Sequence, residues 1–394
     1  MREMRPTIHT MLRRYQNWDY RSRAIYMITL SLANRRSNAL GELVIDSPPG
    51  TPPREVKAHV ALSKLGEGVL ELWKRQSAFV PQIKPLFGMV MPDHFHGILQ
   101  VTEPMTKPLG IVIGAFKGGC TRLWRELLPA ARNGHAHVAA SGPSCSVSGA
   151  TASGLFSDGF NDKILFRAGE LGAWFNYLAD NPRRLAIKRR HPQLFTVVNA
   201  LTIDLGFKAR FSALGNPCLL DAPAFWQVQC SRALFKYRRV EGKIKRDEPP
   251  EITSEAFEEL KADALLAARH GAVLVSPCLS DGEREIARAA YDGNVPLVVI
   301  KNKGFAPLDK PSGRPFDTCA AGRLLMLAPA NWPYTPGQKP MTRLDACTMN
   351  RIAQLIAKSG AADINYRGIK PADVNRLVQE ACMVQPVAGE GRAA

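Results

Sequence analysis

Residues 85–101 are the most informative stretch for the fold, because two apolar runs there flank a pair of histidines. The stretch reads Pro85-Leu-Phe-Gly-Met-Val-Met-Pro92, then Asp93, then His94-Phe95-His96 and Gly97-Ile-Leu-Gln-Val101. Side chains i and i+2 point to the same face of an extended strand, so both imidazoles are expected to project together from a rigid backbone. Two neutral imidazoles in this arrangement are the beginning of a divalent-metal site.

A second segment, about eighty residues downstream, could complete such a site. In Leu171-Gly-Ala-Trp-Phe-Asn-Tyr-Leu-Ala-Asp-Asn-Pro182 the apolar residues follow helical spacing, and Pro182 is predicted to end the helix. Tyr177 and Asn181 are four residues apart and therefore share a helix face. A phenol beside an amide oxygen suits a tyrosine nucleophile with the amide as third metal ligand. Taken alone, the segment would be read as a packed core tyrosine and a helix-ending Asn-Pro.

Together the two segments resemble a known family. Met89-Val-Met-Pro-Asp-His-Phe-His-Gly-Ile-Leu99 resembles the HUH signature (His, hydrophobic, His) of the IS200-like single-tyrosine transposases, which include the REP-associated tyrosine transposases. The usual signature has Asn where this chain has Asp93. The run from Tyr177 to Pro182 resembles the family's tyrosine helix. The resemblance covers roughly residues 20 to 200, since segments 26–31, 109–117 and 160–164 also agree in order.

This resemblance implies a ferredoxin-like α+β nuclease domain that acts on single-stranded DNA. It implies that Tyr177 attacks a phosphodiester, leaving a 5′-phosphotyrosine and a free 3′-hydroxyl, while His94, His96 and Asn181 hold Mg²⁺ or Mn²⁺. A second 3′-hydroxyl could reverse the step and join new ends. The expected partner is single-stranded DNA, with hairpin ends, and a homodimer is left open.

Two other functions fit the same residues. A rolling-circle replication protein or relaxase also uses His-x-His with tyrosine, although a single tyrosine helix downstream favours the transposase. A domesticated, non-cleaving nucleic-acid binder that kept the fold is the second alternative. The intact His94, His96 and Tyr177 argue against it, whereas Asp93 and the additional domain leave it open.

The formal net charge of +17 indicates a polyanionic partner. Residues 1–250 hold 35 Lys and Arg against 19 Asp and Glu, whereas residues 251–394 hold 17 against 16. The basic character thus lies with the part that bears the histidine pair and the tyrosine. A solvated charged face is the alternative to DNA binding. The candidate DNA contacts are Lys117, Arg122, Arg183, Arg184, Lys188, Arg189 and Arg190.

Composition limits the class of protein further. A chain of 394 residues favours two domains over one core. No stretch has the length of a membrane span, so no membrane partner is expected, and the N-terminus lacks the apolar region of a secretory signal. Eight cysteines without CxxC spacing fit reduced thiols, and the expected location is the cytoplasm.

Three regions are expected along the chain. Residues 1–200 form the transposase-like domain, in which the Ala/Gly/Ser-rich stretch 129–158 is predicted to be a disordered insertion. That stretch contains His135-Ala-His137, which is rejected as a ligand pair because a flexible segment holds neither imidazole in place. Residues 201–250 are predicted to be a basic helical linker, with a helix at Phe225–Arg232 and a boundary at Pro249-Pro250.

Residues 251–394 are predicted to form a smaller α/β domain, since apolar strands at 271–276 and 295–300 enclose a helix at 282–291. Ser280 and Glu283 form a capping box at the start of that helix. The region resembles, without GxGxxG or P-loop, the Rossmann-type domain of DNA-processing proteins, and a plain docking domain is the alternative. Ligands of such sheets lie at the carboxyl ends of the strands, which here are followed by Ser276, Ser280, Lys301, Lys303 and Gly304.

Overall fold

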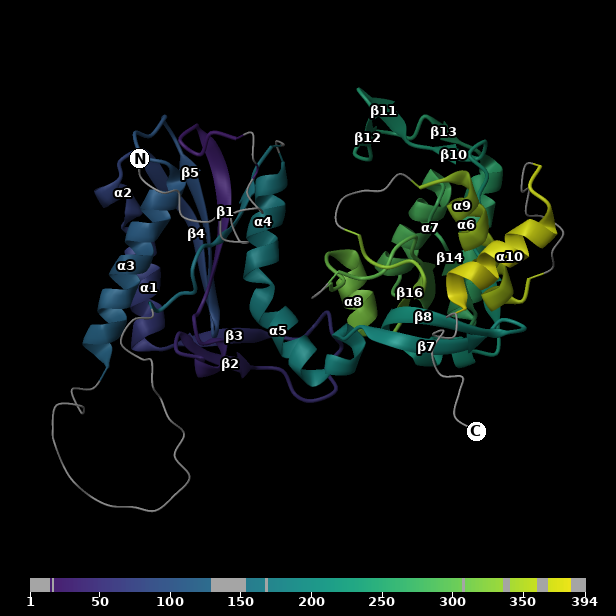
Figure 1. Ribbon diagram of the computed structural model, residues 1–394, viewed down its shortest axis with the longest axis horizontal. Coiled ribbons are helices and arrows are strands. Elements are labelled where there is room, and N and C mark those ends of the chain that lie inside the picture. The colour runs from purple at the N-terminus through teal and green to yellow at the C-terminus, as the bar shows by residue number, and fades with distance from the viewer. Residues whose placement is uncertain are drawn as a thin grey trace, which may run out of the picture. The chain divides into compact units, whose positions relative to one another are not determined.

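The computed structural model describes residues 15, 18–128, 154–166, 169–306, 309–335, 341–359 and 368–383. It divides the chain into two compact units (Figure 1). The first unit comprises Met1–Thr51 and Glu55–Ala186, and the second comprises Pro52–Arg54 and Ile187–Ala394. None of the described helices is both long and apolar enough to cross a membrane.

The first unit is built on a four-stranded antiparallel sheet. Its strand order is β4-β5-β1-β6, and every neighbouring pair is antiparallel. The strands are β1 (Ala24–Ser31), β4 (Ile83–Met91), β5 (His94–Val101) and β6 (Asn161–Ile164). Helices α1 (Lys64–Lys74) and α3 (Leu109–Leu127) cover one face and α4 (Glu170–Ala179) covers the other (Figure 1). The predicted α+β class is therefore confirmed for this unit, which also has the hairpin β2 (Gly41–Ile45) and β3 (Ala58–Leu62) and the short α2 (Gln76–Phe79).

Alternation along β5 sends Phe95 and Leu99 to the face opposite the two histidines. Phe95 and Leu99 enter the core beneath α1 and α3, together with Trp73 and Phe116. Gly97 is needed there, because a Cβ at this position would lie 2.3 Å from the indole of Trp73. Phe95 makes an edge contact with the same indole at 5.1 Å. This face holds β5 rigid and leaves the opposite face for function.

A smaller core lies between the opposite face and α4. Its buried members are Met27, Ile98 and Leu178, with Trp174 and Phe175 packed against them. The rings of Phe175 and Phe87 are 5.7 Å apart. Because Ile98 is two residues from His96 on the same strand, α4 covers the histidine face of the sheet.

Helix α4 ends at Ala179, just before Pro182, as predicted, but the chain continues directly into a second helix. This second helix, α5, spans Asn181–Arg190, and the amide of Arg184 donates to the carbonyl of Asp180 at 3.0 Å. A proline in the first turn of a helix lacks only a donor that would have no partner there, so it begins α5 without cost.

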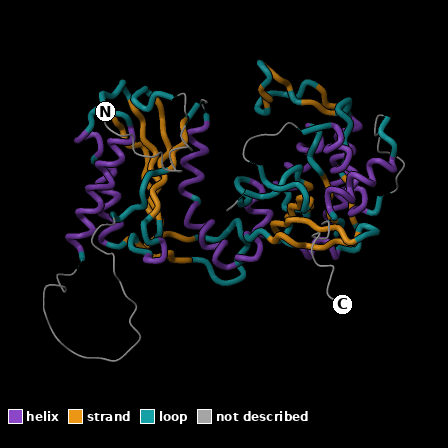
Figure 2. The backbone as a smooth tube through the Cα atoms, in the orientation of Figure 1, coloured by secondary structure: helices purple, strands orange, loops and turns teal. Residues whose placement is uncertain are grey.

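The second unit contains a six-stranded sheet of order β7-β8-β16-β15-β14-β9. The four strands β16, β15, β14 and β9 are parallel, and β8 and β7 continue the sheet in antiparallel fashion. Figure 2 shows this sheet among the helices of the unit. The strands are β7 (Val198–Asp204), β8 (Lys208–Gly215), β9 (Phe225–Gln227), β14 (Val273–Ser276), β15 (Leu297–Ile300) and β16 (Leu324–Pro329).

Helices cover both faces of this sheet. Helices α9 (Arg343–Ala357) and α10 (Pro371–Cys382) pack on Val275, Val298 and Leu325. On the other face α6 (Glu255–Arg269) and α7 (Asp281–Asp292) pack on Leu274 and Leu297. The predicted strand, helix, strand crossover and its capping box at Ser280 and Glu283 are confirmed. The remaining elements are α8 (Arg314–Ala320), η2 (Arg35–Ser37), η3 (Pro192–Phe195), η4 (Pro217–Asp221), β10 (Phe235–Lys236), β11 (Arg238–Val240), β12 (Lys243–Lys245) and β13 (Ile252–Thr253).

The segment 201–250 is not a helical linker. Strands β7, β8 and β9 from this region belong to the second sheet, and Trp226 in the predicted helix pairs with Leu274 of β14. Pairing with a buried parallel strand outweighs the local helical pattern, which aromatic residues support only weakly. The boundary therefore lies between Ala186 and Ile187, inside α5, and not at Pro249-Pro250.

This boundary changes the distribution of charge. Residues 1–186 hold 23 Lys and Arg against 14 Asp and Glu, and residues 187–394 hold 29 against 21. The balances are +9 and +8, so the basic character is shared between the units.

The predicted insertion at 129–158 can be compared with the structure only in part. Positions 129–153, with His135 and His137, lie outside the described residues. Leu155 and Phe156 are buried in the first core, so the predicted insertion ends before them.

Candidate active site

His94 and His96 share one face of β5, as their spacing predicts, and α4 covers this face. Their Nε2 atoms are 3.1 Å apart, and their rings cross at 87°. The neighbouring strands place Met91 and Ser31 beside His94, and Met89 and Thr29 beside His96. The pair thus sits at the start of the inner strand β5, between two strands that hold its backbone.

Each imidazole is held through its Nδ1 atom. His94 Nδ1 lies 2.6 Å from Asp93 Oδ1, and His96 Nδ1 lies 2.8 Å from the Thr29 hydroxyl. The hydrogen bond with His94 holds the pKa of the Asp93 carboxyl below its usual value, so Asp93 is an ionised acceptor. An Nδ1–H that is bound from behind leaves the lone pair on Nε2, which is the tautomer of a metal ligand.

His96 is the more buried of the two imidazoles, with 9% of its surface exposed. Burial lowers the pKa of His96 to about 3, and the charges of His94 and Lys163 act in the same direction, while Asp93 opposes them. His96 is therefore neutral at physiological pH and does not need to lose a proton before it binds a metal.

The separation of the two Nε2 atoms fits a shared metal ion. Metal–nitrogen bonds of about 2.1 Å to both atoms, 3.1 Å apart, subtend an angle of about 95°, which suits adjacent positions of an octahedral ion. Within the described residues, no group of three or more His, Cys, Asp or Glu side chains is suited to a metal. Further ligands would therefore be an amide oxygen, water or substrate.

Asn181 is the amide that the sequence proposes as the third ligand, and this role stays a prediction. It is the first residue of α5, and its Nδ2 atom is buried without a hydrogen-bond partner. The unpaired Nδ2 is a donor and could meet an anionic oxygen, whereas a metal would be held by the amide oxygen Oδ1.

Tyr177 lies on α4 with 41% of its surface exposed, while the next residue, Leu178, is fully buried. Strands β5 and β6 run in the same direction, because both are antiparallel to β1. Helix α4 follows β6 and runs back along the sheet, so its last turn points toward the end where β5 begins with His94 (Figure 1). The guanidinium of Arg184 lies 5.5 Å from the centre of the Tyr177 ring.

The predicted DNA contacts lie in different environments. Arg183 and Arg184 are mostly buried and form ion pairs with Asp180 at 2.5 and 2.6 Å. Lys117 donates to the carbonyls of Ser157 and Gly159. Arg122 on α3 and Arg189 on α5 are exposed, whereas Lys188 and Arg190 are half-buried. Their role in DNA binding stays a prediction.

Two residues near the histidines escaped the sequence reasoning. Thr29 of β1 pairs in register with His96 and holds its ring, and Lys163 of β6 lies on the same face, opposite Met27. The only local signal was their position in segments 26–31 and 160–164, which agree in order with the resembling family. The charge of Lys163 acts on His96, and so Lys163 could meet a phosphate bound at the pair.

Comparison with known proteins finds only distant similarity in sequence and structure. No protein-family model matches the chain. An uncharacterised protein of Haemophilus influenzae is 26% identical over 133 residues, which cover 29% of this chain and 67% of that protein. A solved REP-associated tyrosine transposase bound to a REP hairpin has 14% identity and a TM-score of 0.27, covering 43% of this chain and 72% of that one. A candidate transposase from Deinococcus radiodurans has 12% identity and a TM-score of 0.24, covering 46% and 98%.

Proposed function

We propose that the first unit is an HUH nuclease domain of ferredoxin-like arrangement and that the chain is a single-tyrosine transposase of single-stranded DNA. The strand order β4-β5-β1-β6, with α1 between β1 and β4 and α3 between β5 and β6, supports this arrangement. The observation that carries the proposal is the pair of Nε2 atoms at 3.1 Å on the face that α4, with Tyr177, covers.

In this proposal His94, His96 and Asn181 hold a Mg²⁺ or Mn²⁺ ion, which supplies Lewis-acid stabilisation of a phosphodiester. Tyr177 Oη attacks the phosphorus and gives up its proton. The new P–Oη bond replaces the P–O3′ bond, and the released 3′ oxygen takes up a proton. The 5′-phosphotyrosine keeps the energy of the broken bond, so another 3′-hydroxyl can attack it and regenerate the phenol.

Other residues hold this chemistry in place. Asp93 and Thr29 orient the imidazoles from behind, which fixes the ligand geometry before DNA arrives. Asp180 holds Arg184 beside the ring of Tyr177, where the guanidinium can attract the phosphate that the phenol must approach. Lys163 adds a second positive charge on the histidine side.

The test is to trap the covalent adduct on single-stranded hairpin DNA in the presence of Mn²⁺. Tyr177→Phe should abolish the adduct and leave DNA binding nearly intact, since only the nucleophilic oxygen is removed. Tyr15→Phe, at another exposed tyrosine, serves as the control and should retain the adduct. An adduct of undiminished yield in Tyr177→Phe would eliminate the assignment, and DNA binding without any adduct from the wild-type chain would favour the non-cleaving binder.

A further inference from the structure

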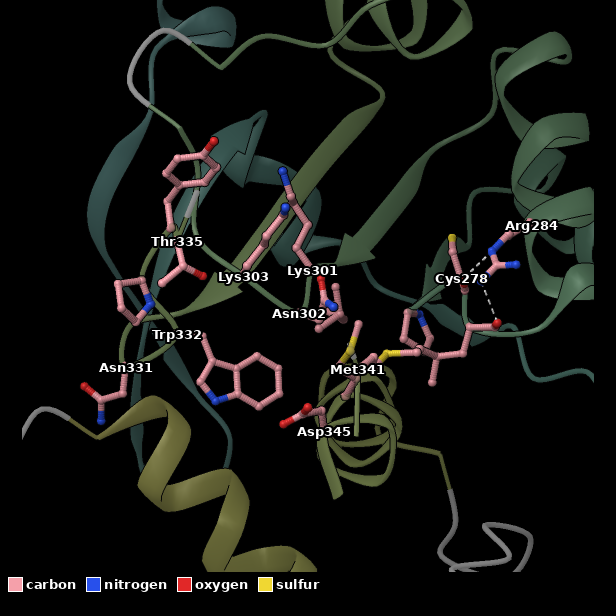
Figure 3. A pocket seen from close by; sticks show the side chains of 16 residues that line it. Cys278, Arg284, Lys301, Asn302, Lys303, Asn331, Trp332, Thr335, Met341 and Asp345 are labelled. Atoms are coloured by element: carbon pink, nitrogen blue, oxygen red, sulfur yellow. Dashed lines mark hydrogen bonds between the residues drawn. The ribbon is translucent and has the colours of Figure 1, made fainter. Parts of the chain in front are cut away.

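A large cavity in the second unit is unused by the proposed DNA chemistry. It has a volume of about 1100 Å³ and lies where β14, β15 and β16 end (Figure 3). Cys278 follows the first of these strands, Lys301 and Lys303 follow the second, and Trp332 follows the third. The carboxyl edge of a parallel sheet is where such folds bind small ligands, and this volume is at the upper end of small-molecule pockets.

The turn between β14 and α7 is not the part that receives a ligand. Glu283 closes it from within, because its carboxylate accepts the amides of Leu279 at 2.6 Å and Ser280 at 3.4 Å. The amide of Cys278 donates to the Ser276 hydroxyl at 3.0 Å. A phosphate at this helix start would have to displace a buried carboxylate. Of the five positions predicted to face a ligand, only Lys301 and Lys303 line the cavity.

The positive charge available to a ligand comes from the two lysines. Arg284 is engaged by the carbonyls of Cys278 and Leu279 and by Asp281. Lys301 has one carboxylate neighbour, Asp309, at 3.2 Å. Lys303 is half-buried and has no acidic partner within the described part of the chain.

Aromatic rings hold both ammonium groups in position. Lys301 Nζ lies 4.3 Å from the centre of the Phe305 ring, and Lys303 Nζ lies 5.7 Å from that of Tyr334. An aromatic face attracts a cation without neutralising it. Lys303 therefore keeps its full charge at the cavity wall, while Lys301 shares its charge with Asp309, and the two ammonium groups together can receive a phosphate.

The rest of the lining suits an aromatic and a polar group. In Figure 3 the indole of Trp332 and the carboxylate of Asp345 lie on one side of the cavity, and the lysine side chains on another. An indole face is a stacking platform for a nucleobase. Asp345 Oδ2 accepts the amide of Thr342 at 2.8 Å at the start of α9, and the carboxylate has further acceptor capacity for a ribose hydroxyl.

We propose that this cavity binds a nucleoside phosphate, with the base against Trp332 and the phosphates at Lys301 and Lys303. The cavity is large enough for a complete nucleotide, and its charge, its indole and its carboxylate match the three parts of that ligand. The site is independent of the histidine pair, so the proposal does not require that the chain cleaves DNA.

The test is calorimetric titration of the full chain with ATP and GTP, each compared with AMP, adenosine and pyrophosphate. A nucleoside triphosphate should bind saturably and more tightly than the nucleoside. Lys303→Gln should weaken triphosphate binding about ten-fold or more, because a charge-assisted hydrogen bond is lost. Trp332→Ala should weaken nucleotide binding and spare pyrophosphate.

Controls separate binding from folding. Lys310→Gln, at an exposed lysine outside the lining, should bind as the wild type does, and Lys303→Arg should restore most of the affinity. Absence of saturable binding of ATP and GTP at millimolar concentration would overturn the proposal. So would unchanged affinity in both Lys303→Gln and Trp332→Ala, or binding of a single-stranded oligonucleotide at these residues without binding of any mononucleotide.

Discussion

The two imidazoles of the first unit depend on groups that touch their far nitrogens. Asp93 stands where the resembling family usually has Asn, and its ionised carboxyl holds His94 Nδ1 at 2.6 Å. A carboxylate in this role makes the imidazole a stronger ligand than an amide does, because it stabilises the partial positive charge that grows on the ring. We therefore expect Asp93 to preserve the proposed metal site.

Asp93→Ala should reduce Mn²⁺ affinity about 10- to 100-fold, and Asp93→Asn should reduce it less, because an amide oxygen still accepts from Nδ1. Titration of the chain with Mn²⁺, followed by electron paramagnetic resonance, measures this. Asp46→Ala breaks a similar Asp–His pair, with His59, on the surface and is the matched control. Equal affinity in Asp93→Ala and Asp46→Ala would show that Asp93 does not orient a ligand.

The ligands themselves are tested by a second set of substitutions. Replacing His94 and His96 with Ala should remove Mn²⁺ binding and metal-dependent cleavage, whereas His59→Ala should retain both. Asn181→Ala should weaken cleavage less completely, since a water molecule can take one coordination position. Loss of activity after replacement of His135 and His137 instead would mean that the wrong histidine pair had been selected.

Helix α4 is held on the sheet by few contacts, so its position is sensitive to single changes. Leu178 is fully buried against Met27 and Ile98, and it is adjacent in sequence to the nucleophile candidate. The same face has no larger core to compensate for a loss. The position of Tyr177 therefore depends on how α4 packs on the sheet through Leu178.

Leu178→Ala should lower the free energy of unfolding of the first unit by about 2–5 kcal/mol, through lost burial and a cavity. It should also reduce adduct formation more than DNA binding. Leu127→Ala, at an exposed leucine that ends α3, should cost far less. Urea unfolding and adduct yield are the measurements, and wild-type values for both in Leu178→Ala would contradict the packing of α4.

Strand β5 has an equally sharp test on its other face. Gly97→Ala should destabilise the first unit, because the new methyl group would overlap the Trp73 indole. Gly114→Ala, on α3 with no atom near the added methyl, should stabilise by up to about 1 kcal/mol. Thermal unfolding of both variants distinguishes the two environments, and a neutral Gly97→Ala would show that Trp73 does not support the histidine strand.

At the scale of the whole molecule, strands β7, β8 and β9, which lie in or next to the predicted linker 201–250, belong to the six-stranded sheet of the second unit. A fragment that ends at residue 250 keeps β7, β8 and β9 without β14 and β16, their partners. Unpaired strands of this kind aggregate. A fragment that ends at residue 190 should instead be soluble and unfold cooperatively, as measured by light scattering and circular dichroism. Monomeric, cooperative behaviour of the longer fragment with protected amides in β7 and β8 would refute the division.

Much of this protein could be predicted because local patterns encode local geometry. The two-residue period of a strand placed His94 and His96 on one face, and the Ser280 and Glu283 capping box marked the start of α7. Other features were decided only by the tertiary structure. Trp226 pairs with Leu274 of a strand almost fifty residues away, and the Thr29 hydroxyl lies behind His96 from a neighbouring strand. The carboxylate of Glu283 occupies the turn before its own helix, so that turn cannot receive a phosphate. A sequence records residue types at each position, but strand pairing and burial are set by the free energy of the whole fold, which no local window contains.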